Sequence, residues 1–404
     1  MTSGVADPHF LGHRAALAWR PGVVQATLTL AALGGVLALG FVGFSPNRIL
    51  TGKSLALWEV VDTPGAAGFA LAGLTLLAGA LAPPHPLRNI VSGVGAVALL
   101  VVTLWVAGDV ATGLTAAAPS PAARVSLGGA FWVLLLAAAL AASDALGRLA
   151  RGHWWRFGAL GLVLAFLIVL ALGGHFDHLS LVREWANRRE AYAAELGRHL
   201  VLVVGALVPA VLAGVPLGLL ALRRPGVAPG LFAGLNLVQT IPSIALFGLL
   251  IGPLTWAADV VPGLRSIGVG GIGAAPALVA LVLYALLPVA RSTHAAFRQV
   301  SPSVIDAARG MGMTGGQVLR RVSLPLAMPV LLSGLRIVLV QLIGLTVVAA
   351  LIGAGGLGTF VFQGLGQTAT DLVLLGAVST IALALFADIV LRVVTLALRK
   401  EGLR

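Results

Sequence analysis

The sequence predicts an all-α integral membrane protein with about ten transmembrane helices. Of its 404 residues, 59% are hydrophobic and only 10% are charged, and the mean hydropathy is +1.02. Soluble domains carry about 25% charged residues, so this composition cannot cover a surface that faces water. Apolar runs of about 17 to 25 residues, the length that a helix needs to cross a bilayer, recur along the chain. They are too long for the alternating strands of a membrane barrel.

Ten segments have the length and composition of a transmembrane span. In lipid every backbone polar group must be satisfied inside the segment, so each is expected to be helical. No cleavable signal peptide is evident ahead of the first segment, which is therefore expected to serve as the insertion signal. The segments run approximately over 22–44, 64–82, 90–107, 125–143, 157–174, 199–222, 231–256, 272–290, 326–352 and 372–398.

The distribution of Lys and Arg predicts the orientation, because positively charged loops stay on the cytoplasmic side. With the N-terminus inside, most of the 26 Lys and Arg residues lie in inner segments and most acidic residues lie in outer ones. Both termini are therefore expected in the cytoplasm, with the chain in the cell (inner or plasma) membrane. Topology and attraction to anionic membrane lipids account for the net charge of +12, and no nucleic-acid partner is expected.

A charged segment at 176–198 divides the chain. Four apolar residues lie near one helical face, which predicts an amphipathic extracytoplasmic helix on the outer leaflet. They are Leu181, Trp185, Tyr192 and Leu196. A docking ridge for an extracytoplasmic partner is the alternative interpretation. Ahead of this segment, residues 1–175 are expected to form an accessory bundle of about five spans, whose small residues permit close packing.

The loop 298–325, between the eighth and ninth spans, is expected in the cytoplasm. Residues 303–306 and 314–317 have the sequence of capping boxes, which predicts two short helices separated by a glycine-rich turn. Neither helix is long enough to be stable alone. A helical pair with small residues at Ala307 and Ala308 is suited to insert into a groove on another protein, whereas the alternative is an ordinary loop.

This loop resembles the EAA loop of ABC importer permeases, whose short coupling helix docks on the ATPase subunit. Glutamate is usual in that family where Asp306 stands, so the carboxylate is kept but its reach is shorter. The resemblance covers about 198–398 and implies that 199–398 is a type I ABC importer permease core of about five helices. The residues that it assigns to ATPase coupling are Asp306, Ala307, Ala308, Gly310, Gly312, Leu324 and Pro325.

Four further runs resemble permeases of the glycine betaine, carnitine and choline (osmoprotectant) uptake systems. They are QTIPS at 239–243, YALLP at 284–288, ARGMGM at 308–313 and IGAGGLG at 352–358. The extra N-terminal spans are similar to one branch of that group. The resemblance implies a pore of two permease subunits, the second being the same or a related chain. It also implies an ABC ATPase dimer that drives transport and an extracytoplasmic substrate-binding protein that delivers the solute.

Two other functions stay open from the sequence. An ABC permease for another small solute, such as an amino acid, is compatible with these motifs, because an aromatic cage for a cation would belong to the binding protein. An ion-coupled secondary transporter would require inverted repeats and functional carboxylates within the spans. Asp388 is the only acidic residue placed in a core span.

No catalytic residue, cofactor or metal site is expected in this chain. Residues 353–358 satisfy G-x-G-x-x-G, but that fingerprint requires a preceding strand, and here it ends a membrane span. Residues 52–54 (GKS) match the end of a Walker A loop, but Asn47 stands where its first glycine must fall. ATP hydrolysis is therefore expected on a partner subunit. The histidines show no paired ligand spacing.

Polar residues within the seventh span predict a kinked segment. Gln239, Thr240, Pro242 and Ser243 lie well inside it, where proline removes a backbone hydrogen bond and polar side chains turn to protein or water. These residues line a translocation pathway on one interpretation. On the other, they make an interhelical hydrogen bond at a structural kink, and the sequence favours neither.

Two charges, Arg336 and Asp388, are embedded at similar depth in the ninth and tenth spans. A structural ion pair is the preferred interpretation, and an ion-coupling site is the alternative. Arg392, one helical turn beyond Asp388, offers that carboxylate a local partner instead.

Overall fold

The computed structural model of the protein describes residues 23–47, 52–82, 85–149, 153–266 and 268–401. The chain divides into two units, Met1–Ala186 and Asn187–Arg404, and each is described by itself. The segment expected in the cytoplasm ahead of the first span, residues 1–21, lies outside the described residues.

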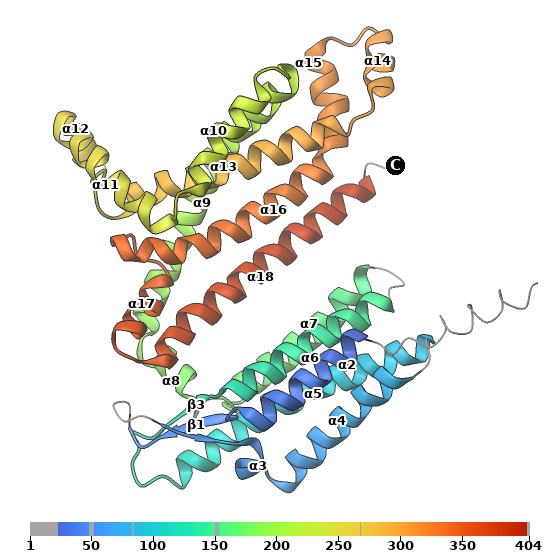
Figure 1. Ribbon diagram of the computed structural model, residues 1–404, viewed down its shortest axis with the longest axis vertical. Helices are drawn as coiled ribbons and strands as arrows, with labels where there is room; N and C mark the ends of the chain where they lie inside the picture. Colours follow the sequence, from blue (N-terminus) through green and yellow to red (C-terminus); the bar gives the residue numbers. More distant parts are fainter. Residues whose placement is uncertain (1–22, 48–51, 83–84, 150–152, 267, 402–404) are drawn as a thin grey trace, which may run out of the picture. The chain divides into compact units, whose positions relative to one another are not determined.

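Most of the first unit is helical (Figure 1). Asp62 begins one helix, because its Oδ1 accepts a hydrogen bond from the N–H of Gly65 at 2.8 Å and Pro64 stands in the first turn. His85 begins the next, because its Nδ1 accepts from the N–H of Leu87 at 3.2 Å. The helices are α2 (Val23–Ala38), α3 (Leu57–Val60), α4 (Thr63–Leu81), α5 (Pro86–Ala116), α6 (Gly129–Arg148), α7 (His153–Leu172) and α8 (Ser180–Asn187).

Small side chains form much of the interface among α4, α5 and α6. Ala107 and Ala138 are buried in one apolar cluster with residues of α2 and α4, so the helices approach closely. Phe41 is fully buried and contacts Phe69 and Phe131 edge to face. The core of this unit therefore combines alanines with larger apolar side chains and a group of aromatic rings.

A small sheet joins the helices of the first unit, although the sequence predicts none. Strands β1 (Val42–Ser45), β2 (Lys53–Leu55) and β3 (Arg124–Leu127) are antiparallel, in the order β2-β1-β3. Val42 pairs with Leu55 on one side and with Leu127 on the other. Strands of three or four residues are too short to show an alternating pattern in the sequence.

The second unit consists of helices joined by turns and short loops, with long helices packed side by side (Figure 1). Short π and 3₁₀ segments, η1 (Leu319–Ser323) and η2 (Ala350–Ile352), flank one of them. The α-helices are α9 (Arg189–Arg223), α10 (Ala228–Thr240), α11 (Ser243–Val260), α12 (Pro262–Ser266), α13 (Ala274–Arg298), α14 (Pro302–Gly310), α15 (Gly315–Val318), α16 (Leu324–Ala349), α17 (Gly358–Gly366) and α18 (Thr370–Glu401).

Helices α9, α13 and α16 form the centre of this unit, and α18 packs on α16. Ala206 and Ala210 of α9 and Ala277 and Ala280 of α13 are fully buried. Such small residues let the backbones of neighbouring helices come close in lipid, where dispersion contacts rather than water exclusion hold helices together.

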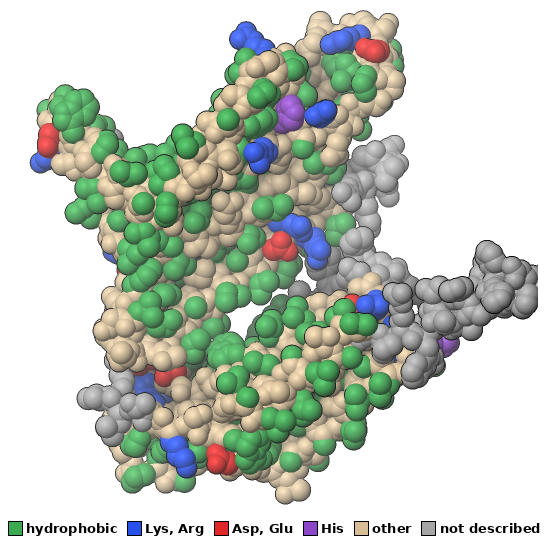
Figure 2. Space-filling view, in the orientation of Figure 1, with side chains coloured by type: hydrophobic (Ala, Val, Ile, Leu, Met, Phe, Trp, Pro, Cys, Tyr) green, Lys and Arg blue, Asp and Glu red, His purple; other side chains and the backbone are tan. Residues whose placement is uncertain are grey.

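The all-α membrane class is confirmed. Among the described residues, eight helices are long and apolar enough to cross a membrane, and two shorter apolar helices, Val23–Ala38 and Gly161–Leu172, lie within the first and fifth predicted spans. Hydrophobic side chains are spread over the helices of both units on the face shown, and charged ones are few (Figure 2).

Two predicted elements differ in detail. The seventh span, 231–256, is not one kinked helix but two, α10 and α11, separated at Ile241 and Pro242. The charged segment 176–198 does not form a separate surface helix, because α9 begins at Arg189 and runs on through the sixth span. Only α8, which ends at Asn187, is a short helix of its own.

Candidate functional site

The loop between α13 and α16 contains one short helix with a free face. Helix α14 begins after Ser301, with Pro302 in its first turn, and ends where Gly312 takes a positive φ of 82°. The predicted capping box at its start is wrong, because no side chain caps this N-terminus. Asp306 is instead exposed, with its Oδ1 at 3.9 Å from a guanidinium nitrogen of Arg309.

The two central alanines of α14 have different surroundings. Ala308 is only 2% exposed and Ile305 packs on the neighbouring apolar cluster of this same unit. Ala307 is exposed, as are Val304 at 41% and Met311 at 76%. These three share one face by their spacing of three and four residues. One side of α14 therefore packs on its own unit, while the other is apolar and uncovered.

The second half of the loop continues into the next long helix. The predicted capping box of Thr314 and Gln317 is confirmed: the N–H of Thr314 donates to Oε1 of Gln317 at 2.8 Å, and the reciprocal bond is 3.4 Å long. Helix α15 then passes through η1 into α16, with Leu324 and Pro325 in the first turn. It is thus the start of a longer rod rather than a separate helix.

The interruption between α10 and α11 brings together most of the polar residues predicted in the seventh span. Thr240 and Pro242 are exposed, and Ser243 is half-buried at the start of α11. The hydroxyl of Thr240 donates to the carbonyl of Leu237 at 2.7 Å, within its own helix. The break therefore places exposed residues, Thr240 and Pro242, in the middle of an apolar segment.

Gln239 faces another helix. Its Nε2 donates to the backbone carbonyl of Tyr284 in α13 at 2.8 Å, and the hydroxyl of Tyr284 donates to the carbonyl of Ile241. The interhelical hydrogen bond that the sequence offered as one of two interpretations is therefore present.

Arg336 of α16 and Asp388 of α18 lie together. Nε of Arg336 is 3.3 Å from Oδ1 of Asp388, and the side chains are 30% and 36% exposed. The two helices pack along each other, so each charge has its counter-charge on the neighbouring helix.

A glycine-rich turn between α16 and α17 is held by α9. Gly355 and Gly356 have φ angles of 78° and 92°, which only glycine adopts freely. The N–H of Gly356 donates to Oε2 of Glu195 at 2.6 Å, and the N–H of Leu357 donates to Nδ1 of His199 at 3.3 Å. We call Glu195, His199 and this turn the α9 clamp.

Sequence reasoning missed the roles of Glu195 and His199. Glu195 is one of many charged residues in the segment 176–198, so its charge did not distinguish it from its neighbours. The signal that could have found the pair is their spacing of four residues, which places both on one face of a helix, directly at the start of a span.

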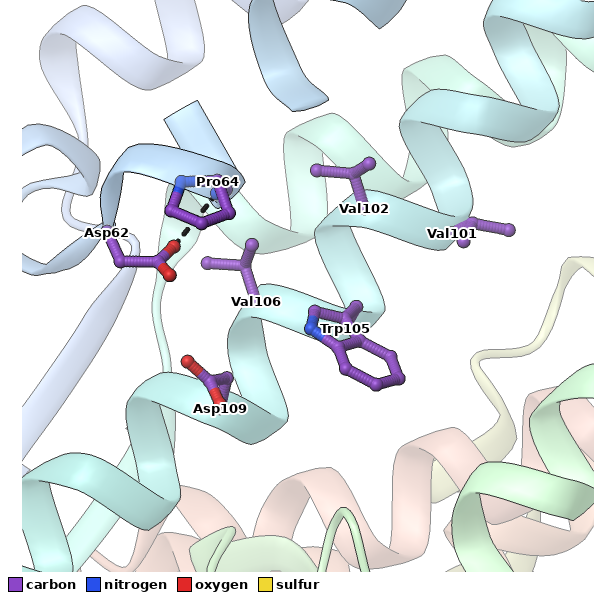
Figure 3. A pocket seen from close by; sticks show the side chains of 8 residues that line it. Asp62, Pro64, Val101, Val102, Trp105, Val106 and Asp109 are labelled. Carbon is purple, nitrogen blue, oxygen red and sulfur yellow. Dashed lines mark hydrogen bonds between the residues drawn. The ribbon is translucent and has the colours of Figure 1, made fainter. Parts of the chain in front are cut away.

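The first unit has a shallow groove of about 170 Å³ between α4 and α5 (Figure 3). Its two carboxylates are exposed, and that of Asp62 already caps α4. No three His, Asp or Glu side chains in the described part of the chain gather to hold a metal ion. The groove is lined by Asp62, Pro64, Gly65, Val101, Val102, Trp105, Val106 and Asp109.

Comparisons with known proteins cover both units. Residues 20–182 match the family described as "ABC transporter permease YehY, N-terminal domain", and residues 210–400 match "Binding-protein-dependent transport system inner membrane component". Among solved structures, the inward-facing MetNI methionine ABC transporter aligns with a TM-score of 0.44 and 27% identity, over 51% of this chain and 95% of that chain.

Curated relatives align over the second unit. The osmoprotectant import permease OsmW of Salmonella typhimurium is 40% identical over 207 residues, 51% of this chain and 91% of that protein. The glycine betaine/carnitine/choline transport system permease OpuCB of Bacillus subtilis is 34% identical over 208 residues, 52% of this chain and 88% of that protein. With the helical core described above, these matches show that the chain belongs to the family of inner-membrane permeases of binding-protein-dependent ABC transporters.

Proposed function

We propose that the chain is the permease subunit of an ATP-driven importer for glycine betaine or a related quaternary-ammonium osmoprotectant. The observation that carries this proposal is the alignment of the second unit with permeases named for osmoprotectants, glycine betaine, carnitine and choline. These relatives support an osmoprotectant over an amino acid as the solute. They also support an ATP-driven importer over an ion-coupled transporter.

The uncovered face of α14 is the proposed contact with the ATPase subunit. Val304, Ala307 and Met311 present an apolar strip, and a short helix with one such strip fits a groove on a partner protein. Ala308 supports this contact from behind, because it packs α14 on its own unit. Asp306, Gly310 and Gly312 shape the rest of the docking helix, and Leu324 and Pro325 begin α16 behind it.

The interruption between α10 and α11 is the proposed lining of the solute pathway. Irregular backbone at membrane depth is tolerated only where it is buried in protein or lines a water-filled cavity. Thr240 and Pro242 are exposed and Ser243 is half-buried, which favours the second of these surroundings. Gln239 stands in the same stretch with its amide turned to α13.

The remaining partners follow from this role. We expect a second permease subunit, identical or related, an ABC ATPase dimer that hydrolyses ATP, and a separate extracytoplasmic binding protein that delivers the solute. Both termini are expected in the cytoplasm, because that orientation places most Lys and Arg residues inside and puts the α14 loop where an ATPase can reach it.

Reconstitution tests the proposal directly. The chain is co-expressed with the ATPase and binding protein encoded beside it, placed in liposomes and assayed for uptake of labelled glycine betaine. Uptake that requires ATP and the binding protein is expected. ATPase activity stimulated by the binding protein without betaine uptake would overturn the proposed solute, and uptake driven by an ion gradient without an ATPase would overturn the importer.

The docking face is tested by a matched pair of substitutions. Ala307→Asp places a carboxylate on the exposed apolar strip, so co-purification of the ATPase is expected to be lost while the permease stays folded. Gly316→Asp places the same charge on the same loop, at an exposed position with open space around its Cβ, and should retain the ATPase. Equal retention of the ATPase by both variants would contradict the docking face.

A further inference from the structure

Proline leaves backbone carbonyls without their helical donors at two points of the second unit. In α13, Pro288 has no N–H, so the carbonyl of Tyr284, four residues earlier, loses its helical donor. Between α10 and α11, Pro242 cannot donate to Val238, whose carbonyl accepts from the N–H of Ile241 at 3.3 Å instead. The carbonyl of Ile241 precedes the first acceptor of α11, which is that of Pro242.

Each of these two points supplies a hydrogen-bond donor for a backbone carbonyl of the other. Nε2 of Gln239, in the last turn of α10, donates to the carbonyl of Tyr284 that Pro288 leaves open. The hydroxyl of Tyr284 in turn donates to the carbonyl of Ile241 at the break. Two side chains thus exchange hydrogen bonds with two backbone carbonyls on opposite helices. We call this arrangement the Gln239–Tyr284 bridge.

The Gln239–Tyr284 bridge lies in apolar surroundings, which strengthen its hydrogen bonds. Tyr284 is 6% exposed and lies in one apolar cluster with Leu246, Phe247 and Leu281, while Gln239 is half-buried. Hydrogen bonds between polar groups in such low-dielectric surroundings are stronger than in water, and an unpaired group there is costly. Movement of the α10–α11 break relative to α13 would break both bonds together, because Gln239 and Ile241 both lie at the break.

We infer that Gln239 and Tyr284 are positioning residues that couple the α10–α11 break to the turn of α13 at Pro288, so that the two change together during transport. The inference rests on the proposed function and reassigns Gln239, because its amide holds α13 rather than meeting the solute. The exposed polar residues at the break are then presented to the pathway by a support on the opposite helix.

The test uses the complete transporter in liposomes and two single variants, each of which removes one of the two hydrogen bonds. Tyr284→Phe deletes only the hydroxyl, and Gln239→Leu deletes the amide at similar volume. Each is expected to lower the amount of betaine taken up per ATP hydrolysed by about fivefold, the factor that corresponds to the net free energy of one hydrogen bond. The double variant should be no worse than the more severe single one, because both bonds belong to one connection.

A second readout reports the geometry itself. The chain has no cysteine, so cysteines at Val260 in α11 and Ala295 in α13, both exposed, take spin labels cleanly. The label-to-label distance is expected to be narrowly distributed in the otherwise unchanged chain and broadened in Tyr284→Phe and Gln239→Leu. Thr255→Val removes a hydroxyl that bonds only its own helix and should change neither uptake nor distance.

The outcomes separate this inference from the proposed function. Unbroadened distances in both single variants, or unchanged uptake per ATP, would overturn the bridge as a coupling element. Absence of betaine uptake in the unchanged chain would overturn the proposed solute. The label-to-label distance is measured without solute, so its broadening in the variants would still show whether the bridge fixes the geometry.

Discussion

At the scale of single residues, close packing explains why particular glycines are required. At Gly358, the first residue of α17, a Cβ would overlap the carbonyl oxygen of Val347 in α16. Backbone cannot move aside as a flexible side chain can, so Gly358→Ala is expected to destabilise the protein by about 1–3 kcal/mol. The midpoint of thermal unfolding in detergent measures this. Gly344→Ala is the control, because nothing lies within 4 Å of its Cβ, and an equal loss there would contradict the packing argument.

The α9 clamp depends on one carboxylate. Glu195→Ala removes the acceptor of the N–H of Gly356 and of the hydroxyl of Thr359, which lies 3.3 Å from the same oxygen. Leaving a buried N–H without a partner costs about 1–3 kcal/mol, so hydrogen exchange at 353–359 is expected to accelerate. Glu190→Ala is the control, because it removes an exposed carboxylate at the start of the same helix. Unaltered exchange in Glu195→Ala would exclude the clamp as a restraint.

At the scale of elements, the sequence predicts the long helices well because their apolar length is a direct consequence of the bilayer. The sequence predicts helix boundaries less well where tertiary contacts determine them. Proline at 242 indicates a kink, but the chain forms two separate helices there, and the hydroxyl of Tyr284 in α13 satisfies the carbonyl of Ile241 at the break. The start of α9 at Arg189 is likewise hidden, because charged residues at 176–198 resemble a surface segment unless the partner turn is known.

The loop 298–325 also shows which features follow from neighbouring residues and which depend on tertiary contacts. The capping box at Thr314 is confirmed because its two partners are neighbours in sequence. The exposure of Ala307 and the burial of Ala308 could not be predicted, because they depend on which side of α14 packs on the rest of its unit. Residue types therefore located this candidate site, and packing assigned its faces.

A double-mutant cycle tests the origin of the Gln239–Tyr284 bridge. Gln239→Leu alone is expected to cost about 1–3 kcal/mol of stability, because the carbonyl of Tyr284 loses its donor. In a Pro288→Ala background the N–H of residue 288 can donate to that carbonyl, so the same substitution should cost clearly less. Thermal unfolding of the four proteins in detergent gives the coupling free energy. Equal costs in both backgrounds would show that the carbonyl is not what Gln239 satisfies.

At the scale of the whole molecule, Arg336 and Asp388 place two opposite charges within predicted spans, and the two side chains lie together. Asp388→Asn leaves the guanidinium of Arg336 without its counter-charge. Because the pair is about one-third exposed, we expect a loss of about 1–3 kcal/mol, smaller than for a fully buried pair. Exchanging the residues, as Arg336→Asp with Asp388→Arg, should recover much of it in thermal unfolding. A loss in the exchanged protein equal to the sum of both single losses would contradict direct pairing.

α15, η1, α16 and η2 are continuous, so the loop is joined directly to a long helical rod. Gly315–Ile352 is one helical rod of 38 residues, about 57 Å long at the rise of an α-helix, and so longer than the hydrocarbon of a bilayer. A tilt of about 5° about one end would displace the other by about 5 Å, from the length that this rise gives. The far end leads into the turn that Glu195 and His199 hold, so a rigid tilt of the rod would carry a displacement at the loop to α9 at the other end of the rod.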